Sequence, residues 1–234
     1  MIVNNKVIKY LEISLNKNYK DIQLEDLIMI ESLCISEIGS GYTNDRVKIN
    51  LSQFRKLQRL YITDSIITKE VLEFISQSSN ITHIEFKHCL FENNLNFDLL
   101  KNIDILVFNN CNINDYSFVN KLENVSTLEI VYPYNDVVID IDQFKNLVKL
   151  KKLFLEGCII EKTNSFSKME KLELLYLMST EINENISLKD MPNLKKIYVS
   201  PKYKNFIQDN GEINVLTNNI DMAIDDSENS KRIV

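Results

Sequence analysis

The apolar residues of this chain follow one spacing that recurs nine times. An aliphatic residue is followed at +3 and +5 by two more apolar residues, and often by another at +10, as in Leu57, Leu60, Ile62 and Ile67. Because side chains alternate along a strand, the +3 and +5 residues face one side and the residue between them faces the other. The units begin 22, 27, 24, 22, 22, 25, 22 and 22 residues apart, at Ile8, Ile30, Leu57, Ile81, Ile103, Val125, Leu150, Leu172 and Leu194.

One position of each unit favours small polar or thiol side chains. Three residues after the last apolar residue of the unit, the chain carries Asn16, Ser65, Cys89, Cys111, Cys158 or Thr180 in six of the units. A side chain of this kind can hydrogen-bond a turning backbone. The L-x-x-L-x-L spacing with a period in the twenties is typical of a leucine-rich-repeat solenoid.

The clearest unit, Ile103 to Leu122, reads IDILVFNNCNINDYSFVNKL. It resembles the internalin-like class of bacterial leucine-rich repeats, whose repeats are about 22 residues long with short return segments. The resemblance implies an α/β repeat solenoid, a horseshoe or arc with a concave parallel β-sheet of about nine strands and short helical, 3-10 or extended return segments. It leaves the function open, because unrelated activities use the same scaffold.

The uninterrupted repeat predicts a single domain over residues 1–217. Residues 203–217 depart from the repeat but keep Phe206, Ile213 and Leu216, so we expect them to cap the open end of the solenoid. Residues 218–234 are polar and acidic, and we expect a disordered tail.

Composition and charge limit the kinds of partner and the cellular location that we expect. The net charge of −6 disfavours nucleic acid, which needs concentrated Lys and Arg, although Lys195, Lys196, Lys202 and Lys204 form one local basic cluster. No apolar run approaches the length of about eighteen residues that spans a bilayer. Residues 1–15 carry lysines and no continuous apolar segment, so we expect neither a signal peptide nor membrane binding, and we expect a cytoplasmic location.

The four cysteines and two histidines are the residues that could form a disulfide or bind a metal ion. Cys89 and Cys111 occupy the same slot in consecutive units, close enough for a disulfide, but buried reduced thiols are the favoured interpretation. Cys34 lies between Leu33 and Ile35, so we expect its thiol to face outward. With no C-x-x-C pair and only His83 and His88, we expect no metal and no other cofactor.

Enzyme motifs are also missing from the sequence. Gly39-Ser40-Gly41 fits neither phosphate-binding glycine spacing. Glu85 and Glu129 lie two units apart in the predicted sheet, and solvated surface charge is the better interpretation of this pair. We therefore expect a protein that is not an enzyme.

Apolar residues on the solvent-facing side of the sheet are not required by the repeat, yet the C-terminal half carries several. Such patches often mark protein-binding surfaces. The alternative is that these residues pack sideways against one another or lie beneath the C-terminal tail. The candidate partner-binding residues on this face are Ile105, Val107, Val131, Phe154, Leu174, Tyr176, Met178 and Tyr198.

Two longer steps of the repeat place insertions on one rim of the sheet, at 39–46 and at 132–136. The second adds Tyr132 and Tyr134 to the candidate binding residues, since insertions in solenoids often border the binding face. The sequence thus predicts a non-catalytic protein-recognition module. One alternative is an intracellular inhibitor or immunity-type protein that masks a toxin or enzyme. Another is a secreted or surface adhesion-type repeat protein. Asn80, Asn124 and Asn185 would then be glycosylation acceptors only in a eukaryotic secretory route.

Overall fold

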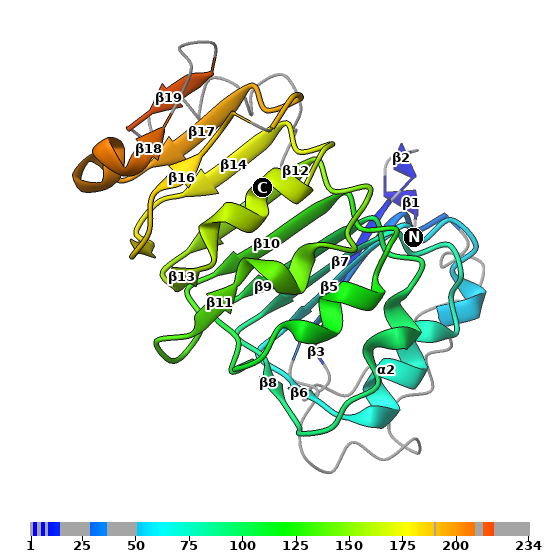
Figure 1. The fold of residues 1–234 in the computed structure, drawn as a ribbon. Coiled ribbons are helices and arrows are strands. Elements are labelled where there is room, and N and C mark those ends of the chain that lie inside the picture. Colours follow the sequence, from blue (N-terminus) through cyan, green and yellow to red (C-terminus); the bar gives the residue numbers. More distant parts are fainter. Residues whose placement is uncertain are drawn as a thin grey trace.

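The computed structural model describes residues 2–3, 6–7, 9–14, 29–36, 51–189, 191–208 and 213–217. Ten of its strands form one sheet in which every strand is parallel to its neighbours. Figure 1 shows this sheet as an open arc, with the helical segments lying over one of its faces. In chain order the strands are β3 (Tyr10–Ser14), β4 (Ser32–Ser36), β5 (Arg59–Thr63), β7 (His83–Lys87), β9 (Ile105–Asn109), β10 (Thr127–Val131), β12 (Lys152–Glu156), β14 (Leu174–Leu177), β17 (Lys196–Val199) and β19 (Asn214–Leu216).

The predicted repeat solenoid with a parallel sheet is confirmed. Nine of the strands coincide with the nine predicted units, and β19 adds a tenth inside the segment 203–217 that the sequence assigns to the cap. The predicted insertion at 39–46 and the predicted tail at 218–234 lie outside the described residues.

The return segments are short, as the period of about 22 residues requires. Besides one α-helix, α2 (Lys69–Ser76), six 3-10 helices occur in the described chain. These are η1 (Leu51–Gln53), η2 (Phe97–Leu100), η3 (Ser117–Lys121), η4 (Ile141–Phe144), η5 (Thr163–Lys168) and η6 (Pro201–Phe206).

Small sheets connect the main strands to the return segments. A parallel three-stranded sheet contains β11 (Val138–Asp140), β13 (Ile159–Glu161) and β15 (Glu181–Ile182). Parallel pairs form between β6 (Ile66–Ile67) and β8 (Leu90–Phe91), and between β16 (Ile186–Ser187) and β18 (Ile207–Gln208). At the N-terminal end, β1 (Ile2–Val3) and β2 (Lys6–Val7) pair antiparallel.

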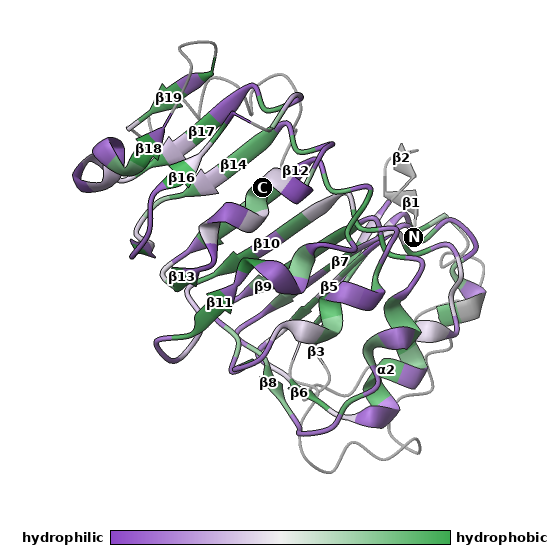
Figure 2. Cartoon of the chain, viewed as in Figure 1, coloured by the Kyte–Doolittle hydropathy of each residue, from purple (hydrophilic) through white to green (hydrophobic). Residues whose placement is uncertain are grey.

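The core lies between the main sheet and the return segments. In the unit of β5, Leu57, Leu60 and Ile62 have no exposed surface, and Phe54, three residues earlier, is also buried. Figure 2 shows that apolar residues recur along the strands of successive turns, while the connections between them are mostly polar. One turn cannot bury its apolar side alone, so each depends on its neighbours.

Six consecutive turns of the described chain leave their main strand through the same backbone conformation. The first residue after the strand, or the second after β14, has a positive φ of 46–71° in each of them. Only one of the six is a glycine, and an L-residue in this conformation is strained unless its surroundings hold it there. The six positions are Asp64, His88, Asn110, Tyr132, Gly157 and Ser179.

The slot that follows this position donates to the turn before it. The Thr180 hydroxyl donates to the carbonyl of Leu155 at 2.6 Å, and the Cys89 and Cys111 thiols lie 3.3 and 3.4 Å from the carbonyls of Ile62 and Phe86. The cysteines are free thiols, as the sequence favoured. In these three turns a small donor ties the strand end to its neighbour, whereas Pro133 occupies the slot in another turn without a donor.

We expect Leu106→Asp, in the fully buried middle of β9, to lower the free energy of unfolding by at least about 3 kcal/mol, because it adds an unpaired carboxylate to an apolar core. Urea unfolding followed by circular dichroism measures the change. The control Val148→Asp alters a side chain that is 61% exposed and should cost less than about 0.5 kcal/mol. Equal losses in the two variants would contradict the assigned register.

Thr180→Val keeps the side-chain shape but removes the hydroxyl that reaches Leu155 and Met178. We expect a loss of about 1–3 kcal/mol, because the buried carbonyl of Leu155 loses its donor. The matched change at the exposed Thr82, Thr82→Val, should leave the thermal midpoint nearly unchanged. A neutral Thr180→Val would show that the slot does not need a donor.

Candidate functional site

The outward face is the side of the main sheet that points away from the return segments. Its central column begins with polar positions: Glu12 is exposed, and Tyr61 and Glu85 are half-buried. Towards the C-terminal end the same column becomes aromatic, with Phe154, Tyr176 and Tyr198 paired in register on β12, β14 and β17. The face thus has two chemically different halves.

The aromatic half is one packed group, here called the aromatic cluster. The rings of Phe154 and Tyr176 have centroids 5.6 Å apart, and those of Tyr176 and Tyr198 are equally far apart. Tilted ring pairs at this spacing are favourable. The full set is Phe154, Leu174, Tyr176, Met178, Tyr198 and Leu216.

Leu216 is the member that the sequence prediction missed. It lies on β19 and pairs in register with Tyr198. The apolar residues Ile213, Val215 and Leu216 in the cap segment were the available signal, but the cap does not repeat the full apolar spacing. The cluster therefore extends to the last strand of the sheet.

The expectation that the cluster side chains face solvent is wrong for three of them. Tyr176, Met178 and Tyr198 are 5%, 9% and 1% exposed, whereas Phe154 and Leu174 are half-buried. Burial raises the pKa of Tyr176 to about 12, and the nearby Glu156 carboxylate adds to the shift. The bulk of neighbouring rings on parallel strands accounts for part of this burial.

The structure does not join all the predicted residues into one patch. Ile105 and Val107 lie on β9, and Val107 is buried. On β10, Thr127 and Glu129 separate them from β12 in the same two columns. Val131 is half-buried at the end of β10. Because Thr127 and Glu129 are polar, the apolar face is interrupted before the aromatic cluster begins.

Tyr132 and Tyr134 stand on the rim beside the cluster and are 49% and 46% exposed. The Tyr132 hydroxyl donates to Glu156 Oε1 at 2.6 Å, which joins the rim to β12 and raises the pKa of Tyr132. The Tyr134 backbone N–H donates to the carbonyl of Cys111 at 3.2 Å. This loop, residues 132–136, is therefore held at its first and third residues while both tyrosine rings remain accessible.

Gly157 makes room for Tyr132. It has a φ of +71°, and a Cβ built on it would lie 2.6 Å from the Tyr132 ring. A larger residue at this position would strain the backbone and displace the ring. The sequence shows the glycine but not the ring that lies against it.

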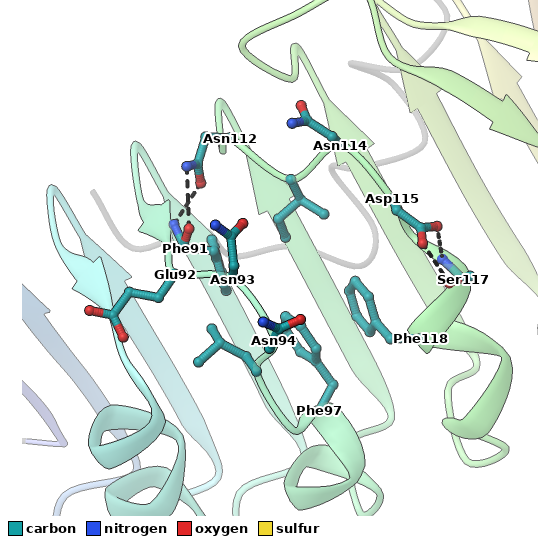
Figure 3. Close-up of a pocket in the computed structure, with 12 residues that line it drawn as sticks. Phe91, Glu92, Asn93, Asn94, Phe97, Asn112, Asn114, Asp115, Ser117 and Phe118 are labelled. Carbon is teal, nitrogen blue, oxygen red and sulfur yellow. Dashed lines mark hydrogen bonds between the residues drawn. The ribbon is translucent and has the colours of Figure 1, made fainter.

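A hollow that the sequence does not reveal lies on the side of the return segments, between the turns of β8 and η3. It has a volume of about 540 Å³ and an apolar lining that includes Phe91, Phe97 and Phe118. Figure 3 shows Asn112 bridging the backbone of Phe91, and Asp115 accepting from Ser117. Asn112, Asp115 and Ser117 thus help to shape the turns that border it.

Comparison with known proteins rests on structure alone. No protein-family model matches the sequence, and no curated protein is significantly similar to it. Internalin C2 from Listeria monocytogenes superposes with a TM-score of 0.57 at 18% identity, covering 86% of this chain and 88% of that one. Human 5T4, also called trophoblast glycoprotein, gives a TM-score of 0.57 at 12% identity, covering 82% and 76% of the two chains.

The protein has the leucine-rich-repeat fold. The functional domain of InlJ from Listeria monocytogenes, which includes a cysteine ladder, also superposes, with a TM-score of 0.55 at 19% identity over 84% of this chain and 40% of that one. In the present chain only Cys89 and Cys111 occupy the slot in consecutive turns. Pro133 occupies it in the turn between those of Cys111 and Cys158. The fold resembles the internalins, as the repeat pattern predicted.

Cys34 of this leucine-rich repeat is not an exposed thiol, contrary to the sequence prediction. It is 9% exposed, because Tyr10 and Tyr61 flank it in the neighbouring turns. Burial raises the pKa of its thiol. A protonated, shielded thiol is a poor nucleophile.

The two histidines do not form a catalytic arrangement. Burial lowers the pKa of His83, with the positive charge of Arg59 as a second cause, and its ring packs against Tyr61. His88 lies 3.3 Å from Asp64 at the rim. Among the described residues of this leucine-rich repeat, no group of three or more acidic, histidine or cysteine side chains is placed to hold a metal ion. Nor does any helix in those residues combine the length and apolarity needed to cross a membrane.

We expect Gly157→Ala to cost about 1 kcal/mol or more, because it adds strain at positive φ and a contact with Tyr132. A double-mutant cycle with Tyr132→Ala separates the two causes. With Tyr132 removed, only the backbone part of the loss should persist. Additive losses measured by denaturant unfolding would show that the ring does not press on Gly157.

Proposed function

We propose that this leucine-rich repeat is a non-catalytic protein-recognition module. In this proposal its partner contacts the C-terminal half of the outward face and the 132–136 rim loop. The observation that carries the proposal is the aromatic column of Phe154, Tyr176 and Tyr198 on a face where the repeat requires no apolar residue. The exposed Tyr132 and Tyr134 stand beside it.

The chemistry of this region suits a protein partner. Tyr, Phe and Met are enriched in protein interfaces, and polar groups usually surround the apolar centre. Lys152 and Lys196 flank Leu174 in the column next to the cluster, and Glu156 lies on the other side. A partner would thus meet an apolar centre with charges of both signs around it.

The area of the outward face indicates that the rim also contributes to the proposed interface. Three outward columns, which span about four residue steps, give on the order of 600 Å² over all ten strands, and about half of that over the C-terminal half, from spacings of about 4.8 Å between strands and 3.3 Å per residue. A standard interface uses about 800 Å² on each partner. The loop at 132–136 would supply the remaining contact, so Tyr132 and Tyr134 are the accessible anchors of the proposed site.

Within this proposal the more specific candidate is a cytoplasmic inhibitor or immunity-type protein that masks a toxin or enzyme. The net charge of −6 would favour a basic target, and cell fractionation would test the location. Nucleic acid and membrane surfaces are not proposed as partners. A bacterial origin, which the internalin-like pattern suggests, fits this candidate.

The secreted adhesion-type alternative has a structural cost at two predicted glycosylation positions. The side-chain nitrogens of Asn80 and Asn124 donate to the carbonyls of Arg55 and Lys101 in the preceding turn, at 3.1 and 2.8 Å. A glycan on either nitrogen would compete with these bonds between turns. These bonds disfavour glycosylation of Asn80 and Asn124 and bear only on a protein of a eukaryotic secretory route.

Replacing both rim tyrosines, Tyr132→Ala with Tyr134→Ala, should weaken partner capture by about 2 kcal/mol or more, roughly thirty-fold, as expected for a hot spot. Capture from a lysate of the source cells, quantified by mass spectrometry against the unaltered chain, measures this loss. Tyr176 is unsuitable for the first test, because removing a buried ring would also destabilise the fold.

The matched control is Tyr10→Ala, which removes an equally exposed tyrosine at the opposite end of the sheet. Its capture should equal that of the unaltered chain. Equal capture by the rim variant, with its thermal midpoint preserved, would refute the proposed site.

A further inference from the structure

The edge at which the strands of the main sheet begin is basic at one end. In each turn this edge consists of the three residues before the main strand and the first residue of the strand. At β12, β14 and β17 these positions hold six lysines and a single acidic residue, Glu173. At the five turns from β4 to β10 the same positions hold two basic and two acidic residues. Positive charge is therefore concentrated where β12, β14 and β17 begin.

Five of the six lysines are exposed, and the parallel register brings them together. β12 pairs with β14, and β14 pairs with β17, so no other turn separates them. Because neighbouring strands lie about 4.8 Å apart, the three turns span about 10 Å. These five residues are here called the lysine edge: Lys149, Lys151, Lys152, Lys171 and Lys195.

Glu173 lies within the lysine edge and balances only part of its charge. Lys195 Nζ lies 2.7 Å from Glu173 Oε2, and Lys151 Nζ lies 3.9 Å from Oε1 of the same carboxylate. The hydrogen bond from Lys195 lowers the pKa of Glu173, and the charges of Lys151 and Lys152 add to this shift. One carboxylate thus faces three lysines, and the lysine edge keeps an excess of positive charge.

The lysine edge borders the surface to which we assign the partner. Lys152 lies on the outward face two residues before Phe154, because side chains alternate along β12. Tyr132 and Tyr134 stand at the opposite rim, where the strands end. A partner centred on the aromatic cluster would therefore meet tyrosines on one side and lysines on the other.

The local charge decides which partner surface fits here more than the net charge does. At physiological ionic strength charges are screened beyond about 8 Å, so the net charge of −6 acts weakly at contact distance. A basic surface at the lysine edge would place like charges together, whereas an acidic surface would pair with them.

The short reach of the lysine edge suits a protein segment. Three to four extended residues span about 10 Å. Duplex DNA carries a charge about every 1.7 Å of its axis and would continue beyond this length. It would then meet Asp104, an exposed acidic residue on the same edge before β9. The observations therefore favour carboxylates of a protein over the phosphates of a nucleic acid.

We propose that the partner presents an acidic segment to the lysine edge. This rests on the proposed function and specifies the charge of the partner surface, which is opposite to the basic target that the net charge favours. The aromatic cluster and the rim tyrosines would supply contact area, and the lysine edge would select the partner by charge.

A fluorescein-labelled hexaglutamate peptide tests this preference without the natural partner. Its fluorescence anisotropy is titrated with the full chain at an ionic strength of about 10 mM, where charges act over about 30 Å. We expect saturable binding that weakens as salt is added. Lys152→Glu with Lys171→Glu should weaken this binding by about ten-fold, because two attractions become repulsions.

The matched control is Lys69→Glu with Lys87→Glu, which changes the net charge equally at two exposed lysines on α2 and β7. It should bind the peptide with nearly the affinity of the unaltered chain. Lys152→Gln with Lys171→Gln removes the charges but keeps long polar side chains, so we expect a loss of about three-fold. Thermal melts followed by circular dichroism check the fold of each variant.

Equal weakening by the edge variant and the control variant would overturn the proposal, as would the absence of saturable hexaglutamate binding. Oligothymidylate and phosphatidylserine vesicles are titrated in the same way. If either binds more tightly than the peptide and loses that binding with Lys152→Glu and Lys171→Glu, the assignment to a protein partner is overturned.

The failure of this proposal can be told from the failure of the proposed function. Tyr132→Ala with Tyr134→Ala should leave hexaglutamate binding unchanged, since the rim stands apart from the lysine edge. If that variant also captures the partner normally, the proposed site at the rim fails while the lysine edge stands. An identified partner whose contacting surface is basic would overturn the lysine-edge proposal alone.

Discussion

Each turn of this protein can bury its apolar side only against the next turn, and the backbone at the end of each strand enforces that stacking. A residue of positive φ turns the chain, and the following small donor bonds to a carbonyl of the preceding turn, as Thr180 does with Leu155. The strain of the five non-glycine positions is held by tertiary contacts, because only Gly157 adopts this conformation freely. The packing of the core, the alignment of the sheet and the shape of the rim all depend on this repeated turn.

The positive-φ position also determines which side chains stand on the rim of the sheet. A side chain at the positive-φ position projects from the rim, and in one turn it is Tyr132. The next turn has glycine at the same position, so the ring can lie against it and reach Glu156. An exposed aromatic group is thereby fixed on a rigid frame, which lowers the entropy lost on binding.

The outward face separates two kinds of surface. Polar and charged residues on β3, β5 and β7 need no cover, whereas the aromatic cluster on β12, β14 and β17 is buried although it points away from the core. Large exposed apolar patches are uncommon in single-chain proteins unless something binds there. The mutual packing of these side chains lowers the exposure of a surface whose composition is typical of an interface.

The sequence by itself determined the repeat, the inward residues and the strand positions. A spacing such as Leu57, Leu60 and Ile62 has one stacked solution, and any slip would turn buried leucines to solvent. It also placed Tyr132 and Tyr134 on the rim correctly, because their insertion follows a strand directly. These are local or periodic properties, which one chain read alone can show.

Only the tertiary structure decided which outward residues are exposed and which are contiguous. Glu129 and Thr127 separate Val107 from Phe154, the flanking tyrosines shield Cys34, and β19 brings Leu216 beside Tyr198. Each of these facts depends on neighbours twenty or so residues away in the chain, or on a strand outside the repeat pattern. Alternation along a strand fixes the direction of a side chain, but exposure depends on what lies above it.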